Sequence, residues 1–91
     1  MTYEWDPKKA SSNLKKHGVS FESAVTMLES ASPKYFSSDM AHDERSVVIG
    51  LDSELRCLVV IIVEKTSDVT RIISARRASK VEEQKWEKQK N

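Results

Sequence analysis

Residues 55–64 read LRCLVVIIVE, and every side chain from position 57 to position 63 is apolar. A strand with one solvated face alternates apolar and polar residues, whereas a strand buried on both faces is apolar throughout. The valines and isoleucines of this run also favour extended backbone. The sequence therefore predicts a central strand that is covered on both sides.

Further strands are predicted before and after this run. Residues 45–51 form one strand, residues 69–75 form another, and polar turns join both of them to the central run. Residues 34–36 are predicted to be a short edge strand. With strict alternation along the last strand and its extension, Arg71 faces one side of the sheet and Arg76 the other.

Two short helices are predicted near the start of the chain. Asp6 followed by proline is typical of a helix start and Gly18 of a helix end, so the first helix covers residues 7–17. Ser20 caps a second amphipathic helix, residues 21–29. In the first helix the side chains predicted to face the core are Ala10 and Leu14, continued by His17. The polar stripe beside them consists of Lys9, Asn13 and Lys16.

The order of elements indicates the α+β class. A first strand is predicted at residues 3–5 and a terminal helix at residues 79–90, in which only Val81 and Trp86 offer apolar anchors. We expect one domain, residues 1–91, with the two N-terminal helices packed on one face of a three- to four-stranded antiparallel sheet and a C-terminal helix.

Length and composition exclude several classes of protein. Ninety-one residues leave room for one domain, and a lone cysteine, Cys57, excludes an internal disulfide. The longest apolar run, residues 57–63, is far shorter than the ~20 residues of a membrane span. The first residues also lack the apolar centre of a signal peptide. We therefore expect a cytoplasmic protein that does not act at a membrane.

Charge is distributed unevenly although the formal net charge is only +1. Residues 1–20 carry +2, residues 21–69 carry −5 and residues 70–91 carry +4. A fold that brings the two basic ends together would make a cationic face suited to a polyanion. The alternative is that these charges only solvate a small domain.

The motifs do not support a metal or a phosphate-binding glycine loop. One cysteine and two widely separated histidines give neither a CxxC nor an HxxxH pair, and only two glycines occur. We therefore expect no metal and no cofactor. What remains is His17, which follows two lysines at the end of a helix and can act as a general base or acid. The alternative is that His17 only caps that helix.

Arginines are concentrated around the end of the last strand. The guanidinium groups of Arg71, Arg76 and Arg77 have the planar fork that binds phosphate. Arg77 has the alternative of solvating the strand end or pairing with an acid of the terminal helix. Trp5 can stack on a base, or it can belong to the core. Together with His17, these groups suit the metal-free transesterification of RNA, in which cations stabilise a phosphorane.

Three segments resemble the BrnT toxins of type II toxin–antitoxin modules. They read YEWDPKK from position 3, NLKKHGVSFESA from position 13 and RIISARRA from position 71. The resemblance implies a RelE-like fold and a ribonuclease that halts translation by cutting RNA. It also implies neutralisation by a BrnA-type ribbon-helix-helix antitoxin, with operator DNA bound only through the complex. The residues that the family marks fall here on Trp5, Asp6, Lys16, His17, Arg45, Arg71 and Arg76.

From the chemistry and the resemblance together we assign two groups of site residues. The catalytic group comprises His17, Arg45, Arg71 and Arg76. The substrate-binding group comprises Lys9, Lys16, Trp5 and Arg77. Two alternatives to a ribonuclease stay open, namely an antitoxin-binding transcriptional co-regulator with weak or no nuclease activity and a structural adaptor that uses the acidic middle of the chain.

Overall fold

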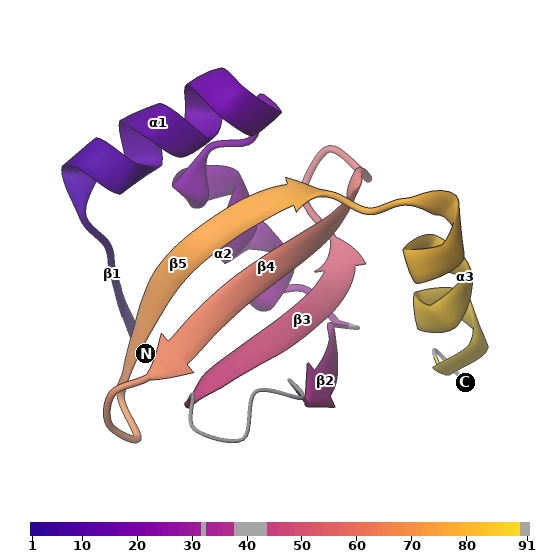
Figure 1. Ribbon diagram of the computed structural model, residues 1–91. Coiled ribbons are helices and arrows are strands. Elements are labelled where there is room, and N and C mark those ends of the chain that lie inside the picture. The colour runs from indigo at the N-terminus through magenta and orange to yellow at the C-terminus, as the bar shows by residue number, and fades with distance from the viewer. Residues whose placement is uncertain (32, 38–43, 90–91) are drawn as a thin grey trace.

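The structure is a computed structural model that describes residues 1–31, 33–37 and 44–89. Figure 1 shows helices arranged around a curved sheet. The helices are α1 (Pro7–His17), α2 (Phe21–Leu28) and α3 (Lys80–Gln89). The strands are β1 (Thr2–Glu4), β2 (Lys34–Ser37), β3 (Arg45–Leu51), β4 (Cys57–Glu64) and β5 (Val69–Arg77). The predicted elements are all present, and residue 90 of the predicted terminal helix lies outside the described part.

In the part of the chain that the structure describes, the sheet has five strands in the order β1-β5-β4-β3-β2. Strands β2 to β5 pair antiparallel, but β1 runs parallel to β5. The expectation of a three- to four-stranded antiparallel sheet is therefore wrong in both count and pairing. The reason is the first strand, which enters the edge beside β5 and continues directly into α1 (Figure 1).

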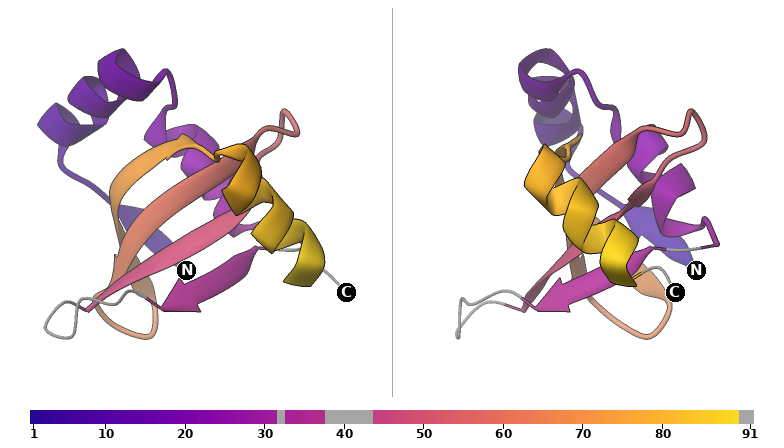
Figure 2. Two further views of the ribbon diagram at one scale, coloured as in Figure 1. Left: turned by 45° about the vertical axis from the view of Figure 1, so that its right-hand side comes forward. Right: turned by 90° about the vertical axis from the view of Figure 1, so that its right-hand side faces the viewer.

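Strand β4 is central and buried on both faces, as its apolar run predicts. Leu58, Val60 and Ile62 join one core cluster with Val19 and residues of α2. On the other face Cys57 and Val59 pack with Trp86 of α3 and with Ile49 of β3. Figure 2 shows α2 and α3 on opposite faces of the sheet, with α1 beyond the edge at β5. The expectation that both N-terminal helices pack on one face is therefore correct for α2 and wrong for α1.

Helix α2 forms as its apolar spacing predicts. Phe21, Ala24 and Met27 are fully buried, and the hydroxyl of Ser20 accepts the backbone N–H of Ser23 at 3.0 Å as the N-cap. Val19, just before the cap, is buried in the same cluster. The hairpin of α1 and α2 thus covers the sheet through α2.

Helix α1 docks differently from the prediction. Ala10 packs against the core as predicted, but Leu14 is half exposed and His17 is exposed, so the rest of the predicted apolar stripe does not face the core. The buried residue is Asn13, which the sequence placed on the polar stripe. The cause is that α1 packs against a strand edge, whose backbone groups need hydrogen bonds rather than apolar cover.

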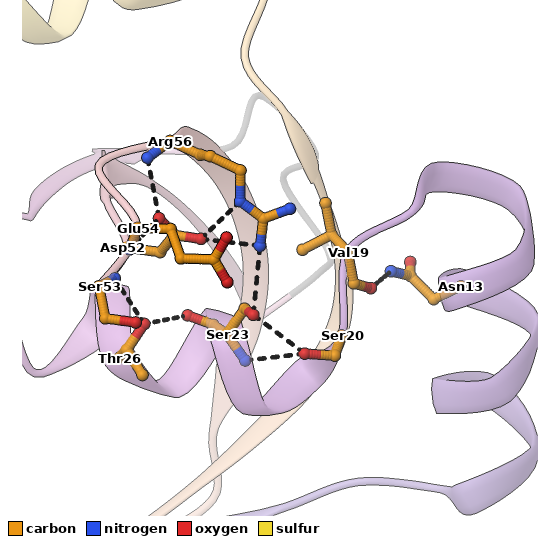
Figure 3. A network of polar contacts seen from close by, with 9 residues as sticks. All are labelled: Asn13, Val19, Ser20, Ser23, Thr26, Asp52, Ser53, Glu54 and Arg56. Carbon is orange, nitrogen blue, oxygen red and sulfur yellow. Dashed lines mark hydrogen bonds and ion pairs between the residues drawn. The ribbon is translucent and has the colours of Figure 1, made fainter.

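The turn between β3 and β4 is fastened to α2 by a polar network (Figure 3). The buried carboxylate of Asp52 accepts the backbone N–H of Arg56 at 2.8 Å and pairs with its guanidinium at 2.9 Å. Arg56 also donates to Ser23 of α2 at 3.2 Å. The backbone N–H of Ser53 donates to Thr26 at 3.0 Å. These bonds place the second helix on its face of the sheet independently of α1.

Strand β5 contains one residue more than β4 between matched positions. Ile62 pairs with Ile72 and Ile61 pairs with Ser74, so Ile73 is extra. A bulge of this kind reverses which face later residues occupy. Ala75 is therefore buried among the core residues beneath α2. The expectation that Arg71 and Arg76 lie on opposite faces is wrong, because strict alternation does not hold across the bulge.

Helix α3 is anchored by one apolar side chain rather than two. Trp86 is buried against the sheet, whereas Val81 is 66% exposed. The second anchor is polar, because Glu82 forms two hydrogen bonds with Arg76 of β5. A charged helix is thus held at both ends, by an ion pair at its start and an indole near its finish.

Candidate functional site

The candidate site lies at the part of the β5 edge that no strand pairs with. Strand β1 pairs only with Val69–Arg71, although β5 continues to Arg77. Past Glu4 the chain turns away into α1, which lies along the remainder of that edge (Figure 1). An unpaired strand edge exposes backbone donors and acceptors to whatever lies beside it.

One side chain of α1 fills part of this edge. Asn13 donates from Nδ2 to the carbonyl of Ala75 at 2.7 Å, and the N–H of Ala75 donates back to Oδ1 at 3.2 Å. The same amide nitrogen also donates to the carbonyl of Val19 at 2.9 Å. Asn13 therefore fixes the helix, the edge of β5 and the α1–α2 corner relative to one another.

A groove of about 330 Å³ lies between α1 and β5. Its α1 wall includes Lys9, Lys16 and His17, and its floor includes Ile73 and Ser74 of β5. Lys9 and Lys16 are seven residues apart, so they lie on one helix face above Asn13. The structure thus brings together Lys9, Lys16 and His17, three of the predicted site residues.

Cationic charge on α1 is not balanced locally. The helix contains four lysines and no acidic residue. Within residues 1–31, 33–37 and 44–89, the ion pairs are Arg56–Asp52, Arg71–Glu4 and Arg76–Glu82, and none of them reaches α1. The groove therefore has a positive potential that favours an anionic ligand.

The bulge in β5 places its two predicted arginines on one face of the sheet. Arg71 lies opposite Val63, and Arg76 lies opposite Val59. Because these β4 residues are four apart, they point to the same side, which is the side of α3. Ser74, opposite Ile61, shares that side and also lines the groove. Bulges near functional sites commonly redirect a side chain in this way.

Arg45 joins the same face from β3. It pairs with Val63 of β4, whose other neighbour is Arg71 of β5. Directly paired residues project to the same side, so Arg45 and Arg71 flank Val63 two strands apart, about 10 Å. Arg45 and Arg71 thus lie on either side of Val63, while Arg76 lies further along β5.

Arg71 and Arg76 of β5 are each paired with a carboxylate. Arg71 pairs with Glu4 of β1 at 2.7 Å. Arg76 forms a bidentate pair with Glu82 of α3, with nitrogen–oxygen distances of 2.8 and 2.7 Å. The hydrogen bonds from Arg76 lower the pKa of Glu82 to about 2, and the same bonds raise the pKa of Arg76. A phosphate that binds Arg76 has to compete with this carboxylate.

Trp5 and Arg77 occupy less central places. The indole of Trp5 packs edge-on against Phe21, with ring centroids 5.8 Å apart, and belongs to the periphery of the core. Arg77 is exposed at the end of β5. Of the two acids of the terminal helix that its alternative names, Glu82 and Glu83, Glu82 is bound by Arg76 instead.

Two residues that shape the site escaped the sequence reasoning, because Asn13 reads as part of a polar surface stripe and Ser74 as an ordinary strand residue. Glu82 was considered only as a partner of Arg77 and not of Arg76. The signal for Glu82 was present, because Ser79-x-x-Glu82 is a capping-box spacing. In the structure the Glu82 carboxylate accepts the N–H of Ser79 at 2.9 Å, which fixes it beside Arg76.

Within the described residues, no group of three or more His, Cys, Asp and Glu side chains is placed to hold a metal ion. No helix of the described chain has the length and apolarity to cross a membrane.

Residues 5–82 match the sequence family described as the ribonuclease toxin BrnT of type II toxin–antitoxin systems. The chain belongs to the BrnT toxin family. Among solved structures it resembles the Brucella abortus ribonuclease toxin BrnT, with 29% identity and a TM-score of 0.70 over 88% of this chain and all of that chain. The chain matches none of the curated protein sequences. The groove between α1 and β5 is therefore a candidate active site on a BrnT fold.

Proposed function

We propose that this BrnT-family toxin is an endoribonuclease that cleaves RNA by transesterification, without a metal, in the groove between α1 and β5. The observation that carries the proposal is the convergence of Lys9, Lys16 and His17 from α1 on Ser74 at the open edge of β5. Two ammonium groups and an imidazole beside one cleft supply the charge and the proton transfer that the reaction needs.

The proposed reaction includes two proton transfers, one from the attacking 2′-hydroxyl and one to the leaving 5′-oxygen. His17 removes the proton of the ribose 2′-hydroxyl, and the 2′-oxygen bonds to phosphorus as the bond to the 5′-oxygen breaks. The leaving 5′-oxygen takes up a proton, which the ammonium groups of Lys9 and Lys16 can donate. The products are a 2′,3′-cyclic phosphate and a free 5′-hydroxyl, so no water or oxidant is consumed.

The arginines take different phosphates in this proposal. Five residues of strand separate Arg71 from Arg76, roughly 15 Å, which is too far for both to hold one phosphate. Arg76, two residues from Ser74, serves the scissile phosphate. Arg45 and Arg71 serve a neighbouring phosphate across the same sheet face. Trp5 and Arg77 contribute to binding at the margins.

RNA cleavage by the purified toxin in excess EDTA tests the proposal. We expect cleavage that survives EDTA and leaves cyclic phosphate ends, and we expect His17→Gln to lose it with an unchanged melting temperature. Arg76→Ala should relieve growth arrest in a bacterial host. Products with 5′-phosphate ends, or full toxicity of a folded Arg76→Ala variant, would contradict the mechanism.

The biological setting is part of the proposal. We infer that the toxin has a RelE-like fold, inhibits translation by cutting RNA in the cytoplasm, and is neutralised by a BrnA-type ribbon-helix-helix antitoxin, through which operator DNA is bound. Family membership supports this setting, because a toxin of a type II module acts with an antitoxin.

A second candidate function is antitoxin-binding co-regulation with weak nuclease activity. The specific observation in its favour is that Arg71 and Arg76 are both engaged by carboxylates. It predicts that the purified toxin leaves free RNA intact while still binding its antitoxin. The EDTA cleavage assay therefore separates the two functions.

A further inference from the structure

A second hollow lies on the outer side of α1. It has a volume of about 700 Å³ and is lined by Pro7, Lys8, Ser11, Ser12, Lys15 and Lys16. The groove beside β5 shares Lys8, Ser12 and Lys16 with it, so the two depressions are continuous around the helix. The catalytic proposal uses only the inner one.

The outer surface of α1 presents cations and hydroxyls at regular intervals. Lys8, Ser12 and Lys15 are four and three residues apart, so they lie along one side of the helix. All three are exposed. No acidic side chain interrupts them within α1, and no ion pair among the described residues reaches them.

A surface of this kind recognises a sugar–phosphate backbone rather than bases. Ammonium groups bind phosphate oxygens as point charges, and serine hydroxyls add sequence-independent hydrogen bonds to phosphate or sugar. The described residues on this side of α1 include no aromatic group on which a base could stack. The surface is therefore suited to positioning a strand and not to reading its sequence.

We propose that the outer side of α1 is a binding track for the RNA backbone flanking the scissile phosphate, through Lys8 and Lys15. This inference rests on the proposed ribonuclease function and deepens it, because it names single-stranded RNA longer than the cleaved dinucleotide as the substrate class. The strand leaves the groove past Lys16 and Lys8, which both depressions share, and continues over Lys15 on the outer side.

The test is binding of an uncleavable probe, a labelled 2′-O-methyl RNA dodecamer of mixed sequence, followed by fluorescence anisotropy from 50 to 300 mM KCl. The variant is the double substitution Lys8→Gln and Lys15→Gln. The charge-matched control is Lys85→Gln and Lys88→Gln on α3, which packs beside β3 and away from α1 (Figure 1).

Each phosphate contact on a single strand contributes about −0.7 to the slope of log K against log salt. We expect the α1 variant to flatten that slope by about 1.4 and to weaken binding at least tenfold at 50 mM KCl, while the α3 variant keeps the wild-type slope. An α1 variant with the wild-type slope overturns the track. Equal or tighter lysine-dependent binding of duplex DNA of the same length overturns the assignment to RNA.

The outcome is independent of whether the toxin is catalytically competent. If wild-type protein leaves RNA intact but binds the probe through Lys8 and Lys15, the proposed ribonuclease function fails and the track stands. If it cleaves RNA and the α1 variant cleaves a long RNA with unchanged KM, the track fails and the ribonuclease stands.

Discussion

Asn13 of α1 bonds both backbone groups of Ala75 in β5, its amide nitrogen to the carbonyl at 2.7 Å and its amide oxygen to the N–H at 3.2 Å. At this position a side chain supplies the two bonds that a neighbouring strand would supply. Lys16 and His17 follow Asn13 by about one helical turn, and Ser74 and Arg76 adjoin Ala75 in the chain. The contact therefore sets the spacing of the groups to which we assign catalysis.

Replacing Asn13 with alanine should reduce both stability and catalysis. The substitution leaves the two buried backbone groups of Ala75 without partners, which costs about 2 kcal/mol of unfolding free energy. Because α1 is then free to shift along the strand edge, we expect kcat for RNA cleavage to fall more than tenfold. Urea unfolding and cleavage kinetics, both at 20 °C, measure the two effects.

Leu28→Ala is the matched control for lost stability. Leu28 packs against the same core from α2 and makes no contact with the groove. A comparable loss of unfolding free energy with kcat retained is expected for it. If both variants lose kcat in proportion to stability, Asn13 has only a structural role.

In the proposed mechanism, Glu82 competes with RNA for the guanidinium group of Arg76. Glu82→Gln keeps a residue that suits the capping box with Ser79 but removes the charge that binds the guanidinium. We expect the dissociation constant for the 2′-O-methyl dodecamer to fall about threefold to tenfold, since phosphate no longer displaces a carboxylate. Glu83→Gln, an exposed neighbour, controls for the change in net charge. Weaker binding by Glu82→Gln would show that the carboxylate orients Arg76 for the substrate.

The same pair makes stability depend on acid pH. Arg76 lowers the pKa of Glu82 from its ordinary value of 4.5 to about 2, so the folded state binds fewer protons than the unfolded state between those values. The stabilisation is complete above pH 4.5 and is lost as the pH falls towards 2. Between pH 5 and pH 2.5 we expect the free energy of unfolding, measured with urea, to fall less for Arg76→Gln than for wild type. If the unfolding free energy of the two proteins falls by the same amount over this pH range, the Arg76–Glu82 pair is not a source of acid sensitivity.

Cys57 reports whether α3 is docked. Burial beneath α3 raises the pKa of its thiol to about 11, with Glu83, Glu82 and Glu87 adding to the effect. Few thiolates form at pH 8, so the folded protein should react with a disulfide reagent on the order of a hundredfold more slowly than a free thiol. Trp86→Ala should accelerate the reaction, and Trp86→Phe, which retains an aromatic ring, should change it little. Rapid labelling of the wild type would mean that α3 leaves the sheet readily.

Local signals predicted most of the fold. The proline and glycine at the ends of α1, the serine cap of α2 and the apolar run of β4 each act within a few residues, and each gave the observed element. The parallel pairing of β1 was not predictable in this way, because it depends on Val69–Arg71, over sixty residues away. The bulge at Ile73 was missed for a related reason, since the register of β5 is set by β4 and not by its own alternation.

The site residues stay a prediction. Basic residues and one histidine at the two ends of the chain indicated a polyanion site, but the groove includes Lys9, Lys16 and His17 from α1 alone and is lined by none of the predicted arginines. The ion pairs of Arg71 and Arg76 depend on which acids the fold brings beside them. Asn13 was assigned to the polar surface because spacing alone does not distinguish an amide in water from one bonded to a strand edge.

The most direct test follows backbone amide signals of ¹⁵N-labelled toxin by NMR during titration with the 2′-O-methyl RNA dodecamer. If one phosphodiester lies between the end of α1 and the middle of β5, the amides of Lys16, His17 and Ser74 shift together with a single dissociation constant. Shifts confined to one of these two elements, or to strands elsewhere in the sheet, would contradict a shared site.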